Sequence, residues 1–338
     1  MTRPALRSAL VGIVGTALAI ATLASLPDVG GRLAQGFAGL ERVRLAWIGI
    51  AAVMFFAMLV AMACAWRVAV SACGSTLTRR EACARYGIGS LVNTFAPFRL
   101  GDAARVAAFA RALDDEDGVW VAGGALGAIE AARVVSVVLL IVIAWSIGAV
   151  PLAWLGLASL ILAALAGVVR FVAVRRPGGN PRVARLLTAV RELAKAPRDA
   201  VRLFAALEIA SASRVLAAVS VCLALKVASP VVAGLLLVVA LELSGQLQLT
   251  PANIGITNGT VAIALTARGI GLDRALTVGF ALQAVETLVG IVFGSAGVIA
   301  LAADSRAAVR RWFPIAVGVA GCVAFVTVAS LGVLGDFS

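Results

Sequence analysis

The stretch Leu91-Val-Asn-Thr-Phe-Ala-Pro-Phe-Arg-Leu-Gly-Asp-Ala-Ala-Arg105 is polar, charged and interrupted by proline and glycine, in a chain that is 62% hydrophobic. A second stretch of the same kind lies far downstream, Leu247-Gln-Leu-Thr-Pro-Ala-Asn-Ile-Gly-Ile-Thr-Asn-Gly259. Both contain the pattern Pro-x-x-Leu/Ile-Gly, from Pro97 to Gly101 and from Pro251 to Gly255. Two interrupted segments at corresponding places in two halves of a membrane protein are typical of a transport site. The alternative, two ordinary connecting loops, stays open at this point.

The composition of the chain is that of a membrane protein. Only 14% of its 338 residues are charged, whereas a soluble domain has about 25% charged residues. The mean hydropathy is +1.04. We therefore predict an all-α polytopic membrane protein. Membrane spans and short loops account for the length, so we expect no separate soluble catalytic domain.

Several kinds of active site are excluded by residue type. The chain contains no histidine, which removes Ser-His-Asp and Cys-His nucleophile arrangements and histidine metal ligands. No G-x-x-x-x-G-K-S/T loop is present, so ATP is not the direct driver. The five cysteines are scattered without a C-x-x-C pair and are interpreted as packing residues: Cys64, Cys73, Cys83, Cys222 and Cys322. We expect no catalytic residue, no metal site and no cofactor.

The acidic run Asp114-Asp-Glu-Asp117 has two interpretations. It could be a magnesium site of the kind that prenyl-transferring enzymes use, which would make the protein an intramembrane transferase acting on a polyprenyl lipid. It could instead be the solvated N-terminal end of the next helix, where the helix dipole favours acidic residues. We favour the second interpretation, because the sequence has no second acidic cluster to hold a diphosphate-bound metal. We therefore predict that the protein is not an enzyme.

Positive charge marks the predicted cytoplasmic side. The chain has 29 lysines and arginines against 17 acidic residues, a net charge of +12. Arginines cluster in 67–118, 170–202 and 303–312, and the second of these regions holds nine basic and two acidic residues. Loops rich in arginine and lysine stay in the cytoplasm, next to anionic lipid. We predict a bacterial inner-membrane protein with a cytoplasmic N-terminus. No nucleic acid partner is expected, because no basic helix carries interleaved aromatic residues.

The same charge pattern predicts two halves of opposite orientation. In each half a span is followed by a broken hairpin and then by further spans, and the arginine counts place the two hairpins on opposite sides of the membrane. This is an inverted-topology repeat with two re-entrant or broken helical hairpins. Whether 230–247 re-enters or crosses the membrane on its own stays open. The predicted divisions are an N-terminal span 1–26, a first repeat 27–176 with a hairpin at about 80–113, a basic cytoplasmic linker 177–201, and a second repeat 202–338 with a hairpin at about 230–270.

Polar residues inside the predicted membrane region are candidates for a substrate site. A charge there costs roughly 2.5–3.5 kcal/mol on insertion scales, so such residues are rare and usually functional. Arginines and half-helix N-termini in a hydrated cavity would bind an anionic headgroup. The candidate substrate-binding residues are Asn93, Pro97, Arg99, Gly101, Asp102, Arg105, Arg133, Arg214, Pro251, Asn253, Gly255 and Asn258, and the candidate proton carriers are Glu130, Glu242 and Glu286. The alternative is that these residues pair, Glu130 with Arg133 and Asp102 with Arg105, and only fix helix packing.

At these residues the chain resembles the lysylphosphatidylglycerol synthase transmembrane-region family, also called the flippase-like domain family. The first motif, Asn93 to Arg105, is close to that family's Pro-x-Arg-x-Gly-Glu-x-x-Arg pattern, and the second, Pro251 to Gly259, is close to Pro-Gly-Gly-x-Gly-x-x-Glu-Gly. Asp102 and Asn258 stand where glutamate is usual, and the lost carboxylate at Asn258 puts a charge- or proton-coupled role of the second hairpin in doubt. The matching positions are Pro97, Arg99, Gly101, Arg105, Pro251, Gly255 and Gly259.

The resemblance, which covers nearly the whole chain, implies movement of lipid between leaflets. In larger relatives a soluble aminoacyl-transferring domain follows and makes the lipid; we expect none here, so synthesis is not implied. The leading hypothesis is an inner-membrane lipid translocator, in which the anionic headgroup of a phospholipid, glycolipid or polyprenyl-linked lipid crosses through a polar cavity between the repeats. Arg99 and Arg105 would bind phosphate, and Asp102 would orient an arginine. The alternative is a non-transporting subunit that scaffolds a glycolipid or hopanoid enzyme. The expected partner is therefore membrane lipid, with an enzyme partner or a second copy of the chain left open.

Overall fold

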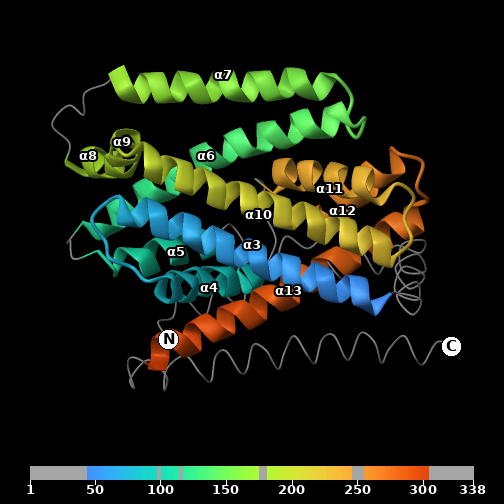
Figure 1. Cartoon of the computed structure of the whole chain (residues 1–338), viewed down its shortest axis with the longest axis horizontal. Coiled ribbons are helices and arrows are strands. Elements are labelled where there is room, and N and C mark those ends of the chain that lie inside the picture. Colours follow the sequence, from blue (N-terminus) through green and yellow to red (C-terminus); the bar gives the residue numbers. More distant parts are fainter. Residues whose placement is uncertain (1–43, 97–99, 114–116, 175–180, 246–254, 304–338) are drawn as a thin grey trace.

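The computed structural model describes residues 44–96, 100–113, 117–174, 181–245 and 255–303 (Figure 1). Within these ranges every regular element is an α-helix, which confirms the predicted all-α class. The helices are α3 (Leu45–Ser71), α4 (Arg79–Phe95), α5 (Leu100–Ala110), α6 (Gly118–Ser146), α7 (Ala153–Val174), α8 (Pro181–Leu186), α9 (Thr188–Lys195), α10 (Pro197–Ala224), α11 (Pro230–Ser244), α12 (Ile256–Thr266) and α13 (Leu272–Ala303). The predicted N-terminal span 1–26 lies outside the described residues.

Among the described residues, four helices are long and apolar enough to cross a membrane, namely α3, α6, α10 and α13. At 1.5 Å per residue they are about 40–48 Å long, which exceeds the roughly 30 Å hydrocarbon core of a bilayer. Large apolar side chains such as Val53, Ile209 and Leu288 are exposed on their outer faces, while others such as Phe55 are buried inside. Helices that are apolar on all faces suit a position between lipid and a protein core. The chain is therefore a multi-pass membrane protein.

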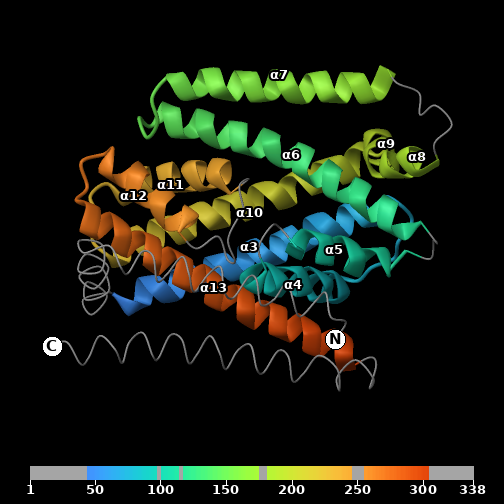
Figure 2. The ribbon, with the colours of Figure 1, turned by 180° about the vertical axis from the view of Figure 1, so that it is seen from behind.

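Two pairs of shorter helices occupy opposite ends of this bundle (Figure 1). α4 and α5 pack against each other beside α3, and α11 and α12 pack against each other beside α10. The two long helices α3 and α10 lie along each other at the centre, and α7 packs on α6 at the edge of the bundle (Figure 2). The two predicted hairpin regions are thus short helix pairs, and in the sequence the motif prolines, Pro97 and Pro251, stand between the two helices of each pair.

The first helix pair begins with a capping box that the sequence Thr78-Arg-Arg-Glu81 encodes. The Thr78 hydroxyl accepts a hydrogen bond from the Glu81 N–H. In return the Glu81 carboxylate accepts from the Thr78 N–H at 2.9 Å and from the Thr78 hydroxyl at 2.8 Å. Two N–H groups that lack intrahelical partners are satisfied in this way, which fixes where α4 starts.

Removing this cap should weaken the start of α4 by a modest amount. Thr78→Ala is expected to lower the free energy of unfolding by about 1 kcal/mol, whereas Thr78→Ser retains the hydroxyl and should be close to neutral. Hydrogen bonds from the Thr78 N–H and hydroxyl hold the pKa of Glu81, which lies outside the four long helices, below its ordinary value of 4.5. The contribution is therefore complete above pH 4.5 and is lost as the pH falls through the lower folded-state pKa. Thermal unfolding of both variants at neutral and acidic pH checks this; an equal loss from both substitutions would contradict the cap.

The basic segment predicted as a linker, 177–201, is helical over most of its described length. It contains α8 and α9, and α10 already begins at Pro197. α8 is held against α6 by an ion pair of 3.2 Å between Arg185 Nε and Asp117 Oδ2, and by Leu186, whose backbone lies against Gly124. A six-residue helix is too short for its hydrophobic periodicity to be detected in the sequence. The basic composition of the segment therefore indicated a loop. Asp117 directly precedes α6, as the helix-end interpretation predicted, while 114–116 lie outside the described residues.

Two apolar clusters form the core, one toward each end of the bundle. The first gathers buried residues of α3, α6, α10, α11, α12 and α13, among them Phe55, Ile141, Val221, Leu237 and Leu265. The second gathers residues of α3, α4, α5, α6, α9 and α10, among them Trp66, Phe109, Ile129 and Leu207, with the Trp66 and Phe109 rings stacked at 4.7 Å. The two halves of each long helix belong to different clusters, one half to each. This division leaves a layer between the clusters in which polar side chains gather.

Candidate functional site

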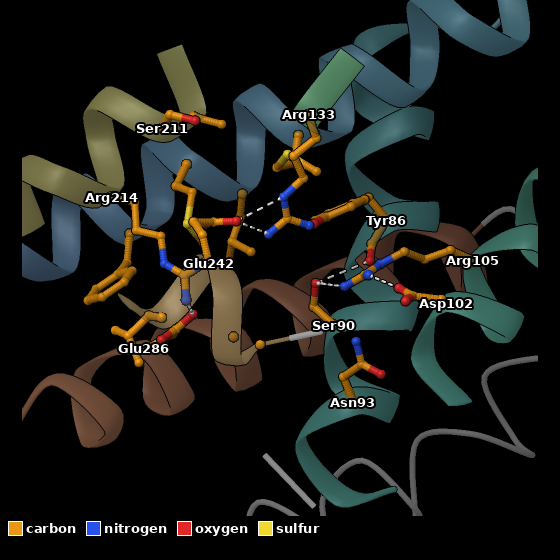
Figure 3. A pocket seen from close by; sticks show the side chains of 18 of the residues that line it. Tyr86, Ser90, Asn93, Asp102, Arg105, Arg133, Ser211, Arg214, Glu242 and Glu286 are labelled. Carbon is orange, nitrogen blue, oxygen red and sulfur yellow. Dashed lines mark hydrogen bonds and ion pairs between the residues drawn. The ribbon is translucent and has the colours of Figure 1, made fainter. Parts of the chain in front are cut away.

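A cavity of about 220 Å³ lies in the layer between the two apolar clusters. Figure 3 shows side chains that line it. The long helices line it near their midpoints, with Met58 and Met62 of α3, Glu130 and Arg133 of α6, Ser211 and Arg214 of α10, and Glu286 and Thr287 of α13. The helix pairs add Tyr86, Ser90, Asn93, Thr94, Asp102 and Arg105 from one end and Leu241, Glu242, Gly245 and Thr257 from the other. The cavity therefore lies at mid-length of the four described helices that are long and apolar enough to cross a membrane.

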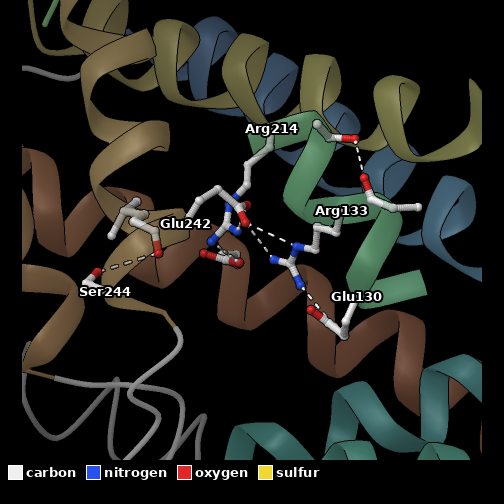
Figure 4. Close-up of polar contacts among 9 residues, drawn as sticks. Glu130, Arg133, Arg214, Glu242 and Ser244 are labelled. Atoms are coloured by element: carbon white, nitrogen blue, oxygen red, sulfur yellow. Dashed lines mark hydrogen bonds and ion pairs between the residues drawn. The ribbon is translucent and has the colours of Figure 1, made fainter. Parts of the chain in front are cut away.

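Five charged side chains form one connected ion-pair network in the cavity wall (Figure 4). Glu242 stands at its centre and is only 7% exposed. Its Oε2 accepts hydrogen bonds from Arg133 Nη2 at 2.8 Å and Arg133 Nε at 3.1 Å, and its Oε1 accepts from Arg214 Nη1 at 2.7 Å. Two outer carboxylates complete the network: Glu130 Oε1 lies 3.6 Å from Arg133 Nη1, and Glu286 Oε1 lies 3.3 Å from Arg214 Nη2. Glu242 therefore joins α6, α10 and α11 through charge-assisted hydrogen bonds at a buried position.

The structure thus brings together both arginines and all three carboxylates that the sequence singled out. The predicted pair Glu130–Arg133 is present, but it is the longest contact of the network. The closest partner of Arg133 is Glu242, which lies 109 residues away in the chain. Both arginines already have carboxylate partners, so an anion in the cavity would compete with these carboxylates for the guanidinium groups.

Arg105 is held within the first helix pair. Its Nη1 donates to Asp102 Oδ1, its Nη2 donates to Ser90 Oγ at 3.2 Å, and its guanidinium carbon lies 4.3 Å from the centre of the Tyr86 ring (Figure 3). The predicted pairing of Asp102 with Arg105 is therefore present. A cation over an aromatic face contributes about 0.5–2 kcal/mol. The contacts with Ser90 and Tyr86 fix α5 onto α4, and the contact with Asp102 lies within α5, while Arg105 also lines the cavity. Arg99, the other predicted phosphate ligand of this motif, and Pro97 lie outside the described residues.

Glycine permits the close approach of α4 and α5. The Asn93 Oδ1 accepts a hydrogen bond from the Gly101 N–H at 2.7 Å. A Cβ on Gly101 would collide with the Asn93 side chain and the Gly89 carbonyl, and a Cβ on Gly89 would collide with Arg105. Asn93 therefore acts as a distant cap for α5, since Gly101 N–H belongs to the first turn, where no carbonyl of the same helix is in reach. This explains glycine at 101 and a side-chain oxygen acceptor at 93.

Removing the Asn93 carbonyl should leave the Gly101 N–H unsatisfied at a partly buried position. Asn93→Ala is expected to lower the free energy of unfolding by about 1–3 kcal/mol, which is the usual cost of losing one partner of a buried hydrogen bond. Asn93→Asp keeps the accepting oxygen and should lose less. Thermal unfolding of the purified protein compares the two. If Asn93→Asp proves the more destabilising variant, the donor of the Asn93 amide matters more than its acceptor, and the capping role is wrong.

The second helix pair is less polar where it is described. Gly255 has a φ of +89°, in the region that favours glycine, and stands directly before α12. Asn258 is 6% exposed, and a Cβ on Gly279 of α13 would lie 3.1 Å from its Oδ1. Thr257, but neither Asn258 nor Gly255, lines the cavity. Pro251 and Asn253 lie outside the described residues. The predicted substrate contacts of Asn258 and Gly255 are therefore not direct contacts with this cavity.

Sequence reasoning missed several uncharged residues of the lining. Tyr86 and Ser90 share one face of α4 with Asn93, at helical spacing of four and three residues, and Met58 and Met62 share one face of α3. The spacing around Asn93 could have indicated the first group, because a polar stripe on a helix within an apolar chain is uncommon. The methionines give no comparable indication, since such residues are usual in any core.

Most of the chain matches a known family. Residues 9–294 match the family described as lysylphosphatidylglycerol synthase TM region. The matched range contains both proline–glycine motifs and every charged residue of the cavity lining. No curated protein matches the sequence. Since the family match covers well over half of the chain, the protein belongs to the lysylphosphatidylglycerol synthase transmembrane-region family.

Proposed function

We propose that the protein moves a lipid between the leaflets of the bacterial inner membrane by passing its headgroup through the cavity. The observation that carries this proposal is a charged cavity at mid-length of four membrane-crossing helices. Charged side chains at that depth are costly unless they serve a hydrated pathway or substrate. The family is a membrane region related to lipid handling, which supports lipid as the substrate class. No chemical step is needed, and the protein acts as a translocator and not as an enzyme.

The arrangement of the helices supports an inverted repeat. α3 followed by the α4–α5 pair and α6 would correspond to α10 followed by the α11–α12 pair and α13. The two motif prolines are 154 residues apart, and the two helix pairs stand at opposite ends of the bundle. In this interpretation α4–α5 is a hairpin that enters from the cytoplasmic side, where the basic helices α8 and α9 lie, and α11–α12 enters from the other side. The cavity then lies between the two repeats, as in many secondary transporters.

The size and lining of the cavity suit a headgroup. A cavity of about 220 Å³ is smaller than the roughly 300–1,000 Å³ of sites for drug-sized ligands, so a whole lipid would not fit. Phosphate would be bound by Arg133 and Arg214, because their contacts to the outer carboxylates Glu130 and Glu286 are the longest of the network. Arginine binds phosphate through two parallel hydrogen bonds, which suits such an exchange. The apolar α3 side of the cavity, with Phe55 and Met58, would face the start of the lipid tail.

Lipid movement in proteoliposomes tests this proposal. Headgroup-labelled anionic lipid should cross wild-type vesicles faster than empty vesicles, and Arg214→Gln should slow the transfer because one phosphate ligand is lost. Lipid mass spectrometry on the purified protein should show one anionic lipid class enriched in the wild type and reduced in this variant. If folded wild-type protein moves lipid no faster than empty vesicles and carries only the bulk lipid mixture, the proposal is wrong and a non-transporting subunit becomes the better hypothesis.

A further inference from the structure

The two repeats meet along two seams that would correspond to each other. One seam lies between α4 and α13, and the other between α11 and α6. If the repeat were perfectly symmetric, both would be packed equally. They are not: α4 packs much more closely on α13 than α11 packs on α6.

Glycines close the α4–α13 seam at the backbone level. A Cβ on Gly87 would lie 3.0 Å from the Phe293 carbonyl, and a Cβ on Gly294 would lie 2.7 Å from Leu91 Cβ and 2.8 Å from the Gly87 carbonyl. Gly297 meets Ala84 in the same way, with its Cβ position 2.6 Å from the Ala84 carbonyl. Small residues that let two backbones touch produce tight helix pairs in lipid. This seam offers no space for a lipid chain.

The α6–α11 seam is built from other residues. The glycines of α6 all lie in the half before Glu130, and none follows Arg133 in the half that faces α11. With the spacing of 154 residues between the motif prolines, Gly87 of α4 corresponds to Leu241 of α11. The Arg133–Glu242 ion pair links α6 and α11 across this seam through long side chains. A link between side-chain ends can be exchanged for a ligand without separating two packed backbones.

From this asymmetry we infer that the α6–α11 seam is the lateral passage through which the lipid headgroup reaches the cavity, and that the α4–α13 seam stays closed. The inference rests on the proposed lipid translocation. A headgroup in a cavity of about 220 Å³ must leave its tails in the bilayer, so one wall has to part while the headgroup moves. The seam bridged by side chains parts at lower cost than the seam held by backbone contact, because an anionic headgroup can give Arg133 a new partner as it separates from Glu242. The Arg133–Glu242 ion pair then holds the passage closed until the headgroup enters. Beside it, large apolar side chains of α6 such as Leu139 and Val142 are exposed, as expected for a surface that faces lipid.

Site-specific photocrosslinking tests where lipid meets the protein. A diazirine amino acid is placed at Val137 or Val238, which lie one helical turn from Arg133 and Glu242 and do not line the cavity. Leu91 in the closed seam is the matched control, and Leu241 in the cavity lining reports occupancy of the cavity itself. Only full-length variants that elute and unfold like the wild type are used. They are irradiated in vesicles of bacterial lipid. Intact-protein mass spectrometry then measures lipid adducts.

The expected result is lipid adducts at Val137, Val238 and Leu241, and none at Leu91. Adducts at Leu91 that equal or exceed those at Val137 and Val238 overturn the passage, while adducts at Leu241 in the same experiment leave the proposed function standing. If lipid labels Leu241 and neither seam, the α6–α11 passage is also wrong. If Leu241 itself remains unlabelled, lipid does not occupy the cavity, and the proposed function fails together with the inference that rests on it.

Discussion

Glu242→Gln should lower the free energy of unfolding by about 3–5 kcal/mol, the usual cost of removing one partner from a buried ion pair. The carboxylate is 7% exposed and binds Arg133 and Arg214 together. The neutral amide of the variant cannot balance two guanidinium groups. Its NH2 group would also face the N–H donors of one of the arginines. The variant should therefore unfold at a much lower temperature, and its α6–α11 contact should loosen. Thermal unfolding, followed by the fluorescence of the native tryptophans, measures the loss.

Glu130→Gln is the matched control for this prediction. Glu130 belongs to the same network, but its contact with Arg133 is 3.6 Å long and a third of its side chain is exposed. A contact of that kind contributes about 0–1 kcal/mol. Similar losses of unfolding free energy in the two variants would mean that Glu242 has no central role and that the carboxylates of the network stabilise the bundle equally. A large loss in Glu242→Gln alone places the structural role on the central carboxylate and leaves the outer ones free to exchange with a ligand.

Gly294→Ala should be destabilising by about 1–3 kcal/mol, because the added methyl overpacks the α4–α13 seam. Its Cβ would lie 2.7 Å from Leu91 Cβ and 2.8 Å from the Gly87 carbonyl, and a backbone carbonyl cannot move aside as a flexible side chain can. The two helices would have to separate by several tenths of an ångström over their length. Thermal unfolding of the purified variant shows the effect as a lower midpoint than that of the wild type.

Gly290→Ala, one turn earlier on α13, should change stability in the opposite direction. The nearest atom to its Cβ position is Thr94 Oγ1 at 3.8 Å, an ordinary van der Waals distance. Alanine in a helix at a compatible position is favoured over glycine by about 0.4–1 kcal/mol, chiefly because the unfolded chain loses freedom. Opposite signs for the two substitutions identify Gly294 as a packing residue. If both variants stabilise the protein, the close seam between α4 and α13 is wrong, and with it the asymmetry on which the lateral passage depends.

Much of this protein is determined locally in the sequence. Long apolar segments predict membrane helices because each must span the hydrocarbon core and satisfy its own backbone. The prolines and glycines at 97–101 and 251–255 predict interruptions, because proline cannot continue a helix and glycine permits the turn that follows. The carboxylates and arginines inside spans stood out as site candidates through their desolvation cost alone, and the structure gathers seven of them, including Arg133 and Glu242, around one cavity.

The tertiary structure alone decided the partners of those charges. Sequence spacing indicated Glu130 for Arg133, three residues away on the same helix, whereas the stronger partner is Glu242 on α11. The tertiary structure also decided that Arg105 contacts Asp102, Ser90 and Tyr86, and that Gly294 packs against Leu91. Hydropathy and helical period report which side of one helix is apolar and how long it is. Which helix faces which, and at what distance, depends on packing between segments more than 100 residues apart, and that information is not contained in any local pattern.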